Sequence, residues 1–127
     1  MSYFFLKLLT LGYEEAISRV REELKKEGFG ILTEIDVKEV LKKKLGADFR
    51  PYIILGACNP PYAYKALQAE ARIGLMLPCN VVVQQTEEGV EVSAIDPVAS
   101  MQAVDNKDIE CIAVEIRDKL KRVIENL

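Results

Sequence analysis

The stretch Tyr52 to Val83, YIILGACNPPYAYKALQAEARIGLMLPCNVVV, decides the fold of this 127-residue chain. Its first part, Tyr52 to Ala57, has no polar alternation, which predicts an interior strand covered on both faces. Asn59 is a strong helix N-cap and the proline after it suits the first helical position, so a helix should run to about Arg72. The apolar run Leu75 to Thr86 predicts a second, long strand. The chain is therefore organised around a strand, a helix and a strand.

Two details of this unit lead to specific expectations. Helical spacing turns four side chains of the helix toward the core, namely Ala63, Tyr64, Leu67 and Ala71. Pro78 cannot donate a hydrogen bond to a ladder, so its position should be a sheet edge or a bulge. Such an irregularity would aim Cys79 and Asn80 away from regular strand pairing.

The residues before this unit predict two strand and helix pairs. A period of two predicts a strand over Tyr3 to Thr10, and helical spacing predicts a helix from Tyr13 to about Glu27. After a short β-rich run, Ile31 to Ile35, Asp36 begins a helix that Gly46 ends, because Glu39 completes a capping-box spacing with Asp36. The buried stripe of this second helix should be Val37, Val40, Leu41 and Leu45.

The residues after the unit predict a hairpin and two helices. Val90 to Ile95 pairs with the preceding strand across the turn Glu87 to Gly89. Asp96 and the proline after it start a short helical piece through Met101. Apolar residues at helical intervals then predict a long amphipathic helix up to Leu127, and Cys111 falls on its polar, exposed face.

The resulting order is β-α-β-α-β-α-β-β-α. It predicts an α+β fold, a two-layer α/β sandwich in which helices cover a mixed, largely antiparallel sheet. No linker is long enough to divide the chain, and a chain of this length can bury a core of its own. We therefore expect a single domain over residues 1–127.

Composition narrows the classes of function. The chain has no histidine, which excludes Ser-His and Cys-His nucleophile pairs and the HExxH zinc site within one chain. Its 17 basic and 20 acidic residues give a net charge of −3 and no clustered basic face, so we expect no nucleic-acid partner. We also expect no cofactor and no metal site.

The cysteines and the start of the chain indicate the compartment. Three cysteines, an odd number, argue against a disulfide framework and favour a reducing environment. The apolar start Tyr3 to Leu11 is interrupted by Lys7 and lacks the pattern of a secretory signal. No run is long enough to span a bilayer, so no membrane partner is expected. These features predict a cytoplasmic protein.

A candidate binding site lies where the two strands of the central unit meet the helix. Its members are Cys58, Asn59, Cys79, Asn80 and Met101. Because the two Cys-Asn pairs end sequential strands, we expect the alpha carbons of Cys58 and Cys79 to lie within about 12 Å of each other. Four interpretations of the cysteines remain open, namely core packing, a small-ligand pocket, redox or nucleophilic thiol chemistry, and a soft-metal site with two thiolates.

Four motifs in order carry a resemblance to a known family. They are LTEIDV (Leu32 to Val37), LGACNPP (Leu55 to Pro61), LPCNVVV (Leu77 to Val83) and DPVASM (Asp96 to Met101). With them the chain resembles the bacterial and archaeal family known as domain of unknown function 302, over nearly its whole length. The resemblance implies a compact α/β sandwich that associates as a dimer, with no established activity, substrate or cofactor.

We therefore expect a domain that binds a small ligand or a protein, without established catalysis. The alternative is a thiol-dependent redox sensor or enzyme that uses Cys58 or Cys79. A homodimer is expected on a second ground as well, because Ile53 to Ala57 and Val81 to Val83 carry more apolar surface than the helices of one small domain can cover.

Overall fold

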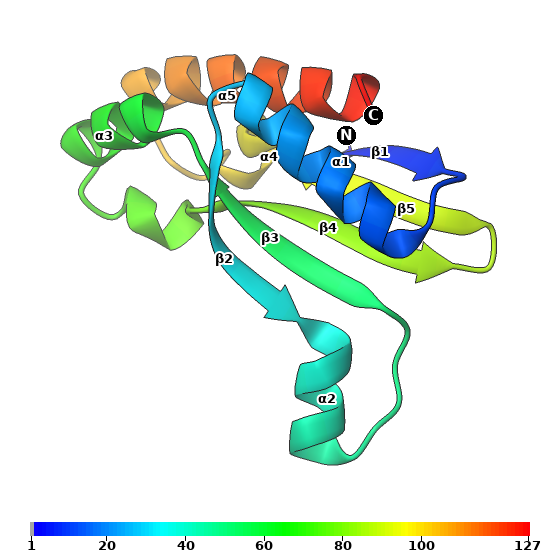
Figure 1. Cartoon of the computed structure of the whole chain (residues 1–127). Coiled ribbons are helices and arrows are strands. Elements are labelled where there is room, and N and C mark those ends of the chain that lie inside the picture. The colour runs from blue at the N-terminus through cyan, green and yellow to red at the C-terminus, as the bar shows by residue number, and fades with distance from the viewer. Residues whose placement is uncertain (1) are drawn as a thin grey trace.

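The computed structural model describes residues 2–127 and contains a five-stranded sheet with helices packed on one side (Figure 1). In chain order the elements are β1 (Phe4–Leu9), α1 (Tyr13–Lys26), β2 (Gly30–Asp36), α2 (Val37–Leu45), β3 (Tyr52–Cys58), α3 (Pro60–Ala69), the short 3-10 helix η1 (Ile73–Met76), β4 (Cys79–Thr86), β5 (Gly89–Ile95), α4 (Pro97–Ser100) and α5 (Lys107–Glu125). The order of strands and long helices agrees with the predicted one.

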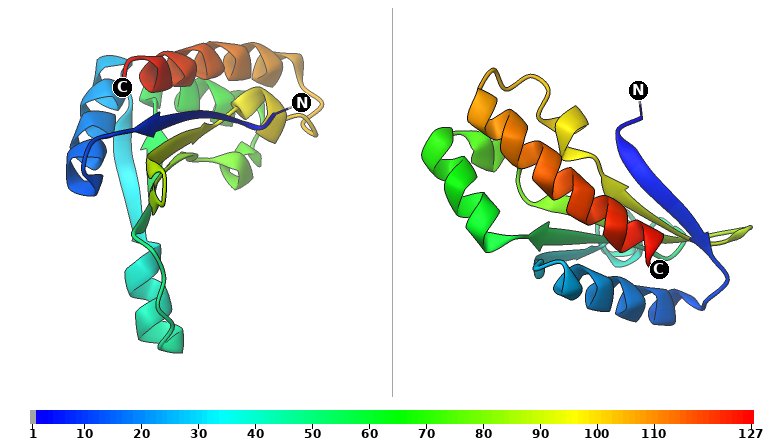
Figure 2. Two further views of the ribbon diagram at one scale, coloured as in Figure 1. Left: turned by 90° about the vertical axis from the view of Figure 1, so that its right-hand side faces the viewer. Right: turned by 90° about the horizontal axis from the view of Figure 1, so that it is seen from above.

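The strands lie in the order β1-β5-β4-β3-β2, and all four neighbouring pairs are antiparallel. Strands β2, β3 and β4 each pair with the next strand in the chain, and β1 closes the sheet beside β5. With α1, α3 and α5 covering one face (Figure 2), this is the predicted α+β, two-layer α/β sandwich. The core lies between the sheet and these helices.

Helix α5 supplies the largest share of the helical core. Its buried residues repeat at helical intervals, as the sequence predicts: Ile109, Ile112, Ala113, Ile116, Leu120, Val123 and Ile124. From the sheet, alternate residues of β4 and β5 face these side chains, which are Cys79, Val81 and Val83 together with Val90, Val92 and Ala94. Cys111 is exposed on the outer side of α5, as predicted.

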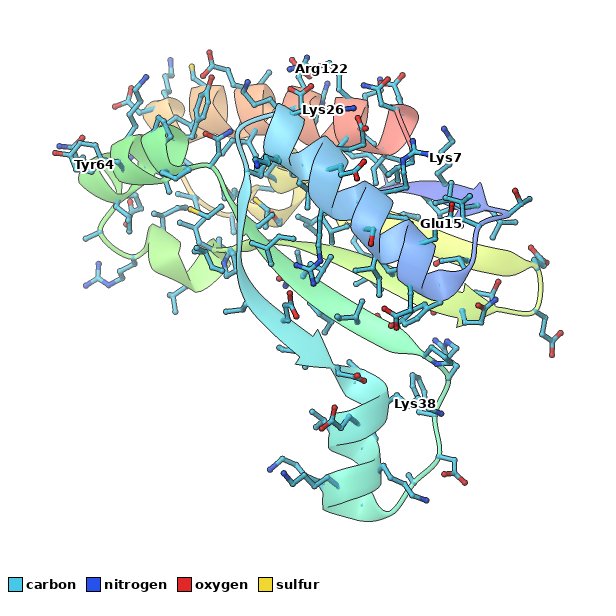
Figure 3. All side chains as sticks on the ribbon, in the orientation of Figure 1. Lys7, Glu15, Lys26, Lys38, Tyr64 and Arg122 are labelled. Carbon is cyan, nitrogen blue, oxygen red and sulfur yellow. The ribbon has the colours of Figure 1, made fainter. Side chains whose placement is uncertain are left out.

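Helix α3 is shorter than predicted and presents a different face. It ends at Ala69 because Glu70 has an extended backbone, three residues before the predicted end at Arg72. Of the four residues expected to face inward, Tyr64, Leu67 and Ala71 are exposed (Tyr64 is labelled in Figure 3) and Ala63 is only half-buried. The core face is instead formed by residues at i, i+4 and i+7: Tyr62, Ala66 and Ala69. A shift of the buried stripe by one position explains the error.

The expectation for Pro78 was also wrong. Residues Ile73–Met76 form η1 in place of the predicted start of a strand, and β4 begins only after the proline. Pro78 therefore costs the ladder no hydrogen bond. Cys79 and Asn80 pair regularly with Ala57 and Gly56 in the interior of the sheet. The register shift of this sheet lies elsewhere, in β2 between Ile31 and Thr33.

Helix α2 stands away from the rest of the molecule, on the side of the sheet opposite α5 (Figures 1 and 2). The Asp36 side chain caps it by accepting a hydrogen bond from the Glu39 amide at 3.0 Å, as predicted. The predicted buried stripe is wrong, because no residue of Val37–Leu45 is buried and Leu45 is 74% exposed. Helix α2 is linked to the loop before β3, where the Lys38 ammonium donates to the Phe49 carbonyl at 2.7 Å (Lys38 is labelled in Figure 3).

Strand β3 is interior to the sheet, as predicted, but helices cover only one of its faces. The inward residues Ile53, Leu55 and Ala57 belong to the core or pack against it. Alternation places the other residues on the opposite side of the sheet, which we call the open face. By register, the open face comprises Phe4, Leu6, Leu8, Thr33, Ile35, Tyr52, Ile54, Gly56, Asn80, Val82, Gln84, Glu91, Ser93 and Ile95.

Candidate functional site

The end of β3 and the start of β4 bring two cysteines together. Ala57 lies directly opposite Cys79 in the ladder, and Cys58 is the next residue along β3. Opposed alpha carbons are about 5 Å apart and consecutive ones about 3.8 Å, so those of Cys58 and Cys79 lie within about 9 Å. The expected proximity of the two cysteines is confirmed. All three cysteines of the chain are free thiols.

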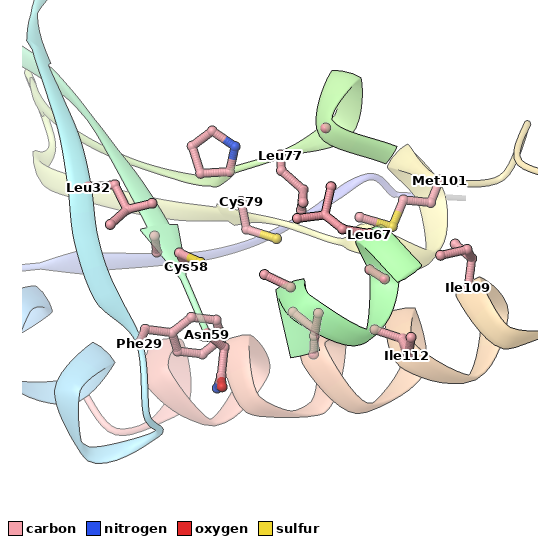
Figure 4. Close-up of a pocket in the computed structure, with 16 residues that line it drawn as sticks. Phe29, Leu32, Cys58, Asn59, Leu67, Leu77, Cys79, Met101, Ile109 and Ile112 are labelled. Atoms are coloured by element: carbon pink, nitrogen blue, oxygen red, sulfur yellow. The ribbon is translucent and has the colours of Figure 1, made fainter. Parts of the chain in front are cut away.

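Beside these cysteines is an apolar cavity of about 300 Å³, between the sheet, α3 and α5 (Figure 4). Its walls carry almost no polar surface. They are formed by Phe29, Leu32, Ala57, Cys58, Asn59, Ala63, Ala66, Leu67, Gly74, Leu77, Pro78, Cys79, Met101, Ile109, Ile112 and Ile116. A volume of this size is at the lower end of the range for small-molecule pockets.

Four of the five candidate residues line this cavity, namely Cys58, Asn59, Cys79 and Met101. Asn80 does not. It follows Cys79 in a regular strand, so its side chain lies on the open face, where it is exposed. The two Cys-Asn pairs are thus not equivalent in space, because the first ends a strand and the second begins one.

Asn59 has a structural partner that its predicted role as a helix cap did not include. Its side chain makes no cap hydrogen bond to α3, and its Nδ2 donates to the Glu27 carbonyl at 3.0 Å. The carboxamide is buried and turned away from the two thiols (Figure 4). Asn59 therefore fastens the end of β3 to the C-terminal end of α1, and it shapes the cavity wall without aiming a polar group at the thiols.

The N-terminus of α3 does not offer an anion site. The first two residues, Pro60 and Pro61, have no N–H group. The next two amides, those of Tyr62 and Ala63, both donate to the Asn59 carbonyl, at 3.1 and 2.9 Å. This end of the cavity therefore has no free helix amide for a phosphate or carboxylate group.

Both thiols that face the cavity are held in the neutral form. Burial, followed by the neighbouring Cys58 thiol, raises the pKa of Cys79 to about 11. Burial also raises the pKa of Cys58 above its ordinary value. Because the thiolate is the reactive species, these directions oppose nucleophilic or redox reactivity at neutral pH.

The donor atoms near the cavity suit an apolar molecule better than an ion. Two thiols and the Met101 thioether are soft, polarisable groups that pack well against apolar or aromatic surface. Within residues 2–127 no cluster of three or more His, Cys, Asp or Glu side chains could hold a metal ion. In the same described part of the chain, no helix has both the length and the apolar character to cross a membrane.

Several cavity residues had no signal in the sequence. Phe29 precedes β2, Leu32 lies within β2, Leu77 precedes β4, and Ile109 and Ile112 belong to the core stripe of α5. Each follows an ordinary core pattern, so spacing alone could not assign it to a cavity. The 3-10 helix η1, which lies between α3 and β4 in the chain, contributes Gly74 to the lining.

The chain is thus a small α+β protein with an antiparallel sheet, one layer of helices and an apolar pocket at the end of the sheet. Residues 6–127 match the family model described as domain of unknown function DUF302. The chain belongs to this family, as the four motifs indicated.

A solved structure supports the assignment. The chain is similar to an uncharacterized conserved protein DUF302 from Bacillus stearothermophilus, known from a crystal structure, with 31% sequence identity and a TM-score of 0.91. The similarity covers 98% of each chain. A search of the curated proteins finds no match.

Proposed function

We propose that this protein binds a small, uncharged and largely apolar molecule in the cavity beside Cys58 and Cys79. The observation that carries the proposal is the lining, because sixteen residues enclose about 300 Å³ with almost no polar surface. An apolar, sulfur-lined cavity of this size favours a compact aliphatic or aromatic ligand. A charged ligand would lose its hydration without finding a partner there.

The entrance supports the same proposal. Leu67 and Leu32 line the cavity and are also 47% and 67% exposed, so they extend the apolar surface outward to solvent. A ligand that covered these two side chains would gain additional apolar burial. The cytoplasmic location expected from the sequence remains part of the proposal, supported by the three free thiols.

A thiol-dependent sensor or enzyme is the second candidate, because Cys58 and Cys79 line one cavity. The raised pKa values of both thiols weigh against this candidate. A ligand site needs only their shape and polarisability, whereas a sensor needs a thiolate. The ligand site is therefore the function that the geometry supports best.

The experiment uses N-phenyl-1-naphthylamine, a neutral apolar fluorescent probe, titrated into the purified full chain. We expect saturable fluorescence enhancement that Leu67→Lys weakens about tenfold or more, because a cation at the entrance opposes transfer of the probe from water. Leu75→Lys is the matched control, since Leu75 is 83% exposed and does not line the cavity. Absence of saturable binding, or equal binding by both variants, contradicts the proposal.

A further inference from the structure

Helix α2 and the loop after it form an arm that differs in charge from the rest of the molecule. The arm, residues 37–50, contains five basic and two acidic residues and has a net charge of +3. Of the 17 basic and 20 acidic residues of the chain, the other 12 and 18 lie outside the arm, and they give the body a net charge of −6. Because α2 projects away from the sheet (Figure 1), the positive charge is separated in space from the negative body.

The charge is also sorted along the arm. Acidic side chains lie at its base, where Asp36 caps α2 and Glu39 belongs to the first turn. The last turn carries three consecutive lysines, Lys42, Lys43 and Lys44, and lies farthest from the sheet in Figure 1. Lys43 and Lys44 border the hollow beside the base of the arm, but in the described part of the chain neither forms an ion pair or a side-chain hydrogen bond. Their charges therefore remain available to an external partner.

An exposed apolar side chain stands next to these lysines. Leu45, the last residue of α2, is 74% exposed and directly follows Lys44. The chain then turns back at Gly46, which has a φ of 64°. Lysine stems are apolar as well, and they can lie along an apolar surface while their ammonium groups stay in water. The end of α2 therefore combines cations with apolar surface.

Charge complementarity requires an anionic partner, and Leu45 selects among the anionic partners. A nucleic acid offers phosphates to the lysines, but its backbone offers the leucine no apolar surface. An anionic bilayer offers both, because an apolar layer lies directly beneath its charged headgroups. Helices that bind such surfaces carry lysines together with exposed apolar residues such as leucine.

The length of α2 allows the arm to approach such a surface ahead of the body. Its nine residues span about 14 Å at about 1.5 Å per residue. Interactions between exposed charges are largely screened beyond about 8 Å at physiological ionic strength. When the end of α2 touches an anionic surface, most of the negative body thus lies beyond the range of strong repulsion.

We propose that the end of α2 binds the surface of an anionic phospholipid bilayer, with the ammonium groups of Lys43 and Lys44 at the lipid headgroups and Leu45 just below them. The expected absence of a membrane partner rests on the lack of a spanning run, and a peripheral contact of this kind does not need one. Within the described residues, the arm contributes nothing to the lining of the ligand cavity. The bilayer contact is therefore independent of the proposed ligand function, and either can fail without the other.

The test is co-sedimentation of the purified full chain with sucrose-loaded vesicles of phosphatidylcholine that contain about 30% phosphatidylserine. We expect binding that weakens as salt is added and that vesicles of phosphatidylcholine alone do not support. The double variant Lys43→Gln, Lys44→Gln should weaken binding about tenfold or more, since each lysine near such a surface contributes about fivefold. Leu45→Gln should weaken it about fivefold or more through the loss of apolar burial.

The matched controls lie on α5, on the opposite side of the sheet from α2 (Figure 2). The double variant Lys107→Gln, Lys121→Gln removes the same charge from exposed positions, and Val114→Gln replaces an apolar residue that is 44% exposed. Both should bind the vesicles as the wild type does, and circular dichroism checks that every variant folds. Equal binding by the α2 and α5 variants overturns the proposal. A wild type that does not bind the anionic vesicles, or that binds duplex DNA but not the vesicles, overturns it as well.

Discussion

The side-chain amide of Asn59 donates a hydrogen bond to the backbone carbonyl of Glu27, with 3.0 Å between Nδ2 and the oxygen. This bond joins the end of β3 to the C-terminal end of α1, which are 32 residues apart in the chain. Gly28 follows at a positive φ of 86°, and a side chain there would approach the Asn59 amide to 3.2 Å. The CNPP motif thus specifies a contact between elements in addition to the start of a helix.

Replacement of Asn59 by alanine should lower the free energy of unfolding by about 1 to 3 kcal/mol, because the Glu27 carbonyl loses its partner in a part-buried position. Urea denaturation followed by circular dichroism measures the change. Asn80→Ala is the matched control, since Asn80 occupies the second Cys-Asn pair and is exposed, and it should change stability by less than about 0.5 kcal/mol. Equal effects of both substitutions would show that the Glu27 contact contributes little.

Gly56 lies on the open face, where the side chains of Thr33 and Pro78 cover it. A Cβ atom at this position would overlap Thr33 Oγ1 and lie 2.7 Å from Pro78 Cγ. We expect Gly56→Ala to destabilise the fold by about 1 to 3 kcal/mol, and Thr33→Ala to restore part of that loss in the double variant. Gly30→Ala serves as the control in the neighbouring strand, because a Cβ at Gly30 meets nothing within 4 Å. The midpoints of urea denaturation of the wild type, Gly56→Ala, the double variant and Gly30→Ala measure these differences in stability.

The three cysteines should react with iodoacetamide in a fixed order at neutral pH. Cys111 is exposed, whereas Cys79 is buried and Cys58 has a raised pKa. We expect Cys111 to be alkylated first, because it is accessible, whereas burial shields the cavity thiols and raises their pKa values. Peptide mapping of the native protein over time gives the order. Faster labelling of Cys58 or Cys79 would move the thiol-dependent function ahead of the ligand site.

The Cys79 thiol should make stability depend on pH in the alkaline range. Its pKa rises from about 9 to about 11 on folding, so the unfolded chain loses this proton first. Stability is therefore fully present below about pH 9 and falls as the pH rises toward 11, by about 2 to 3 kcal/mol in total.

The measurement is the free energy of unfolding in urea of the wild type and of Cys79→Ala at several pH values between about 8 and 11. This range covers the pKa of the Cys79 thiol in the unfolded and the folded chain. The variant should lose the part of the slope that this thiol contributes, whatever its stability at pH 8. Cys111→Ala is the control for the removal of an exposed thiol. If Cys79→Ala keeps the wild-type slope, other groups cause the alkaline loss.

Local patterns in the sequence determined much of this protein. The period-two run of β1, the helical stripe of α5 and the caps at Asp36 and Asp96 each depend on neighbours within a few residues, and each formed as predicted. The four motifs also identified the family. Such features are decided locally, because backbone dihedral preferences and hydrogen bonds near helix ends involve only adjacent residues.

Tertiary structure decided what those patterns could not. The stripe on α2 has good helical spacing, yet none of its residues is buried, because α2 stands away from the helices that cover the other face of the sheet. Pro78 lies just before β4, outside the strand, because Ile73–Met76 form the 3-10 helix η1 and not the start of a strand. Cys79 and Asn80 went to opposite faces of the sheet because the register of β4 with β3 fixes which residues point inward. Register and helix placement depend on contacts between residues distant in the chain, and these contacts form both the apolar cavity and the open face.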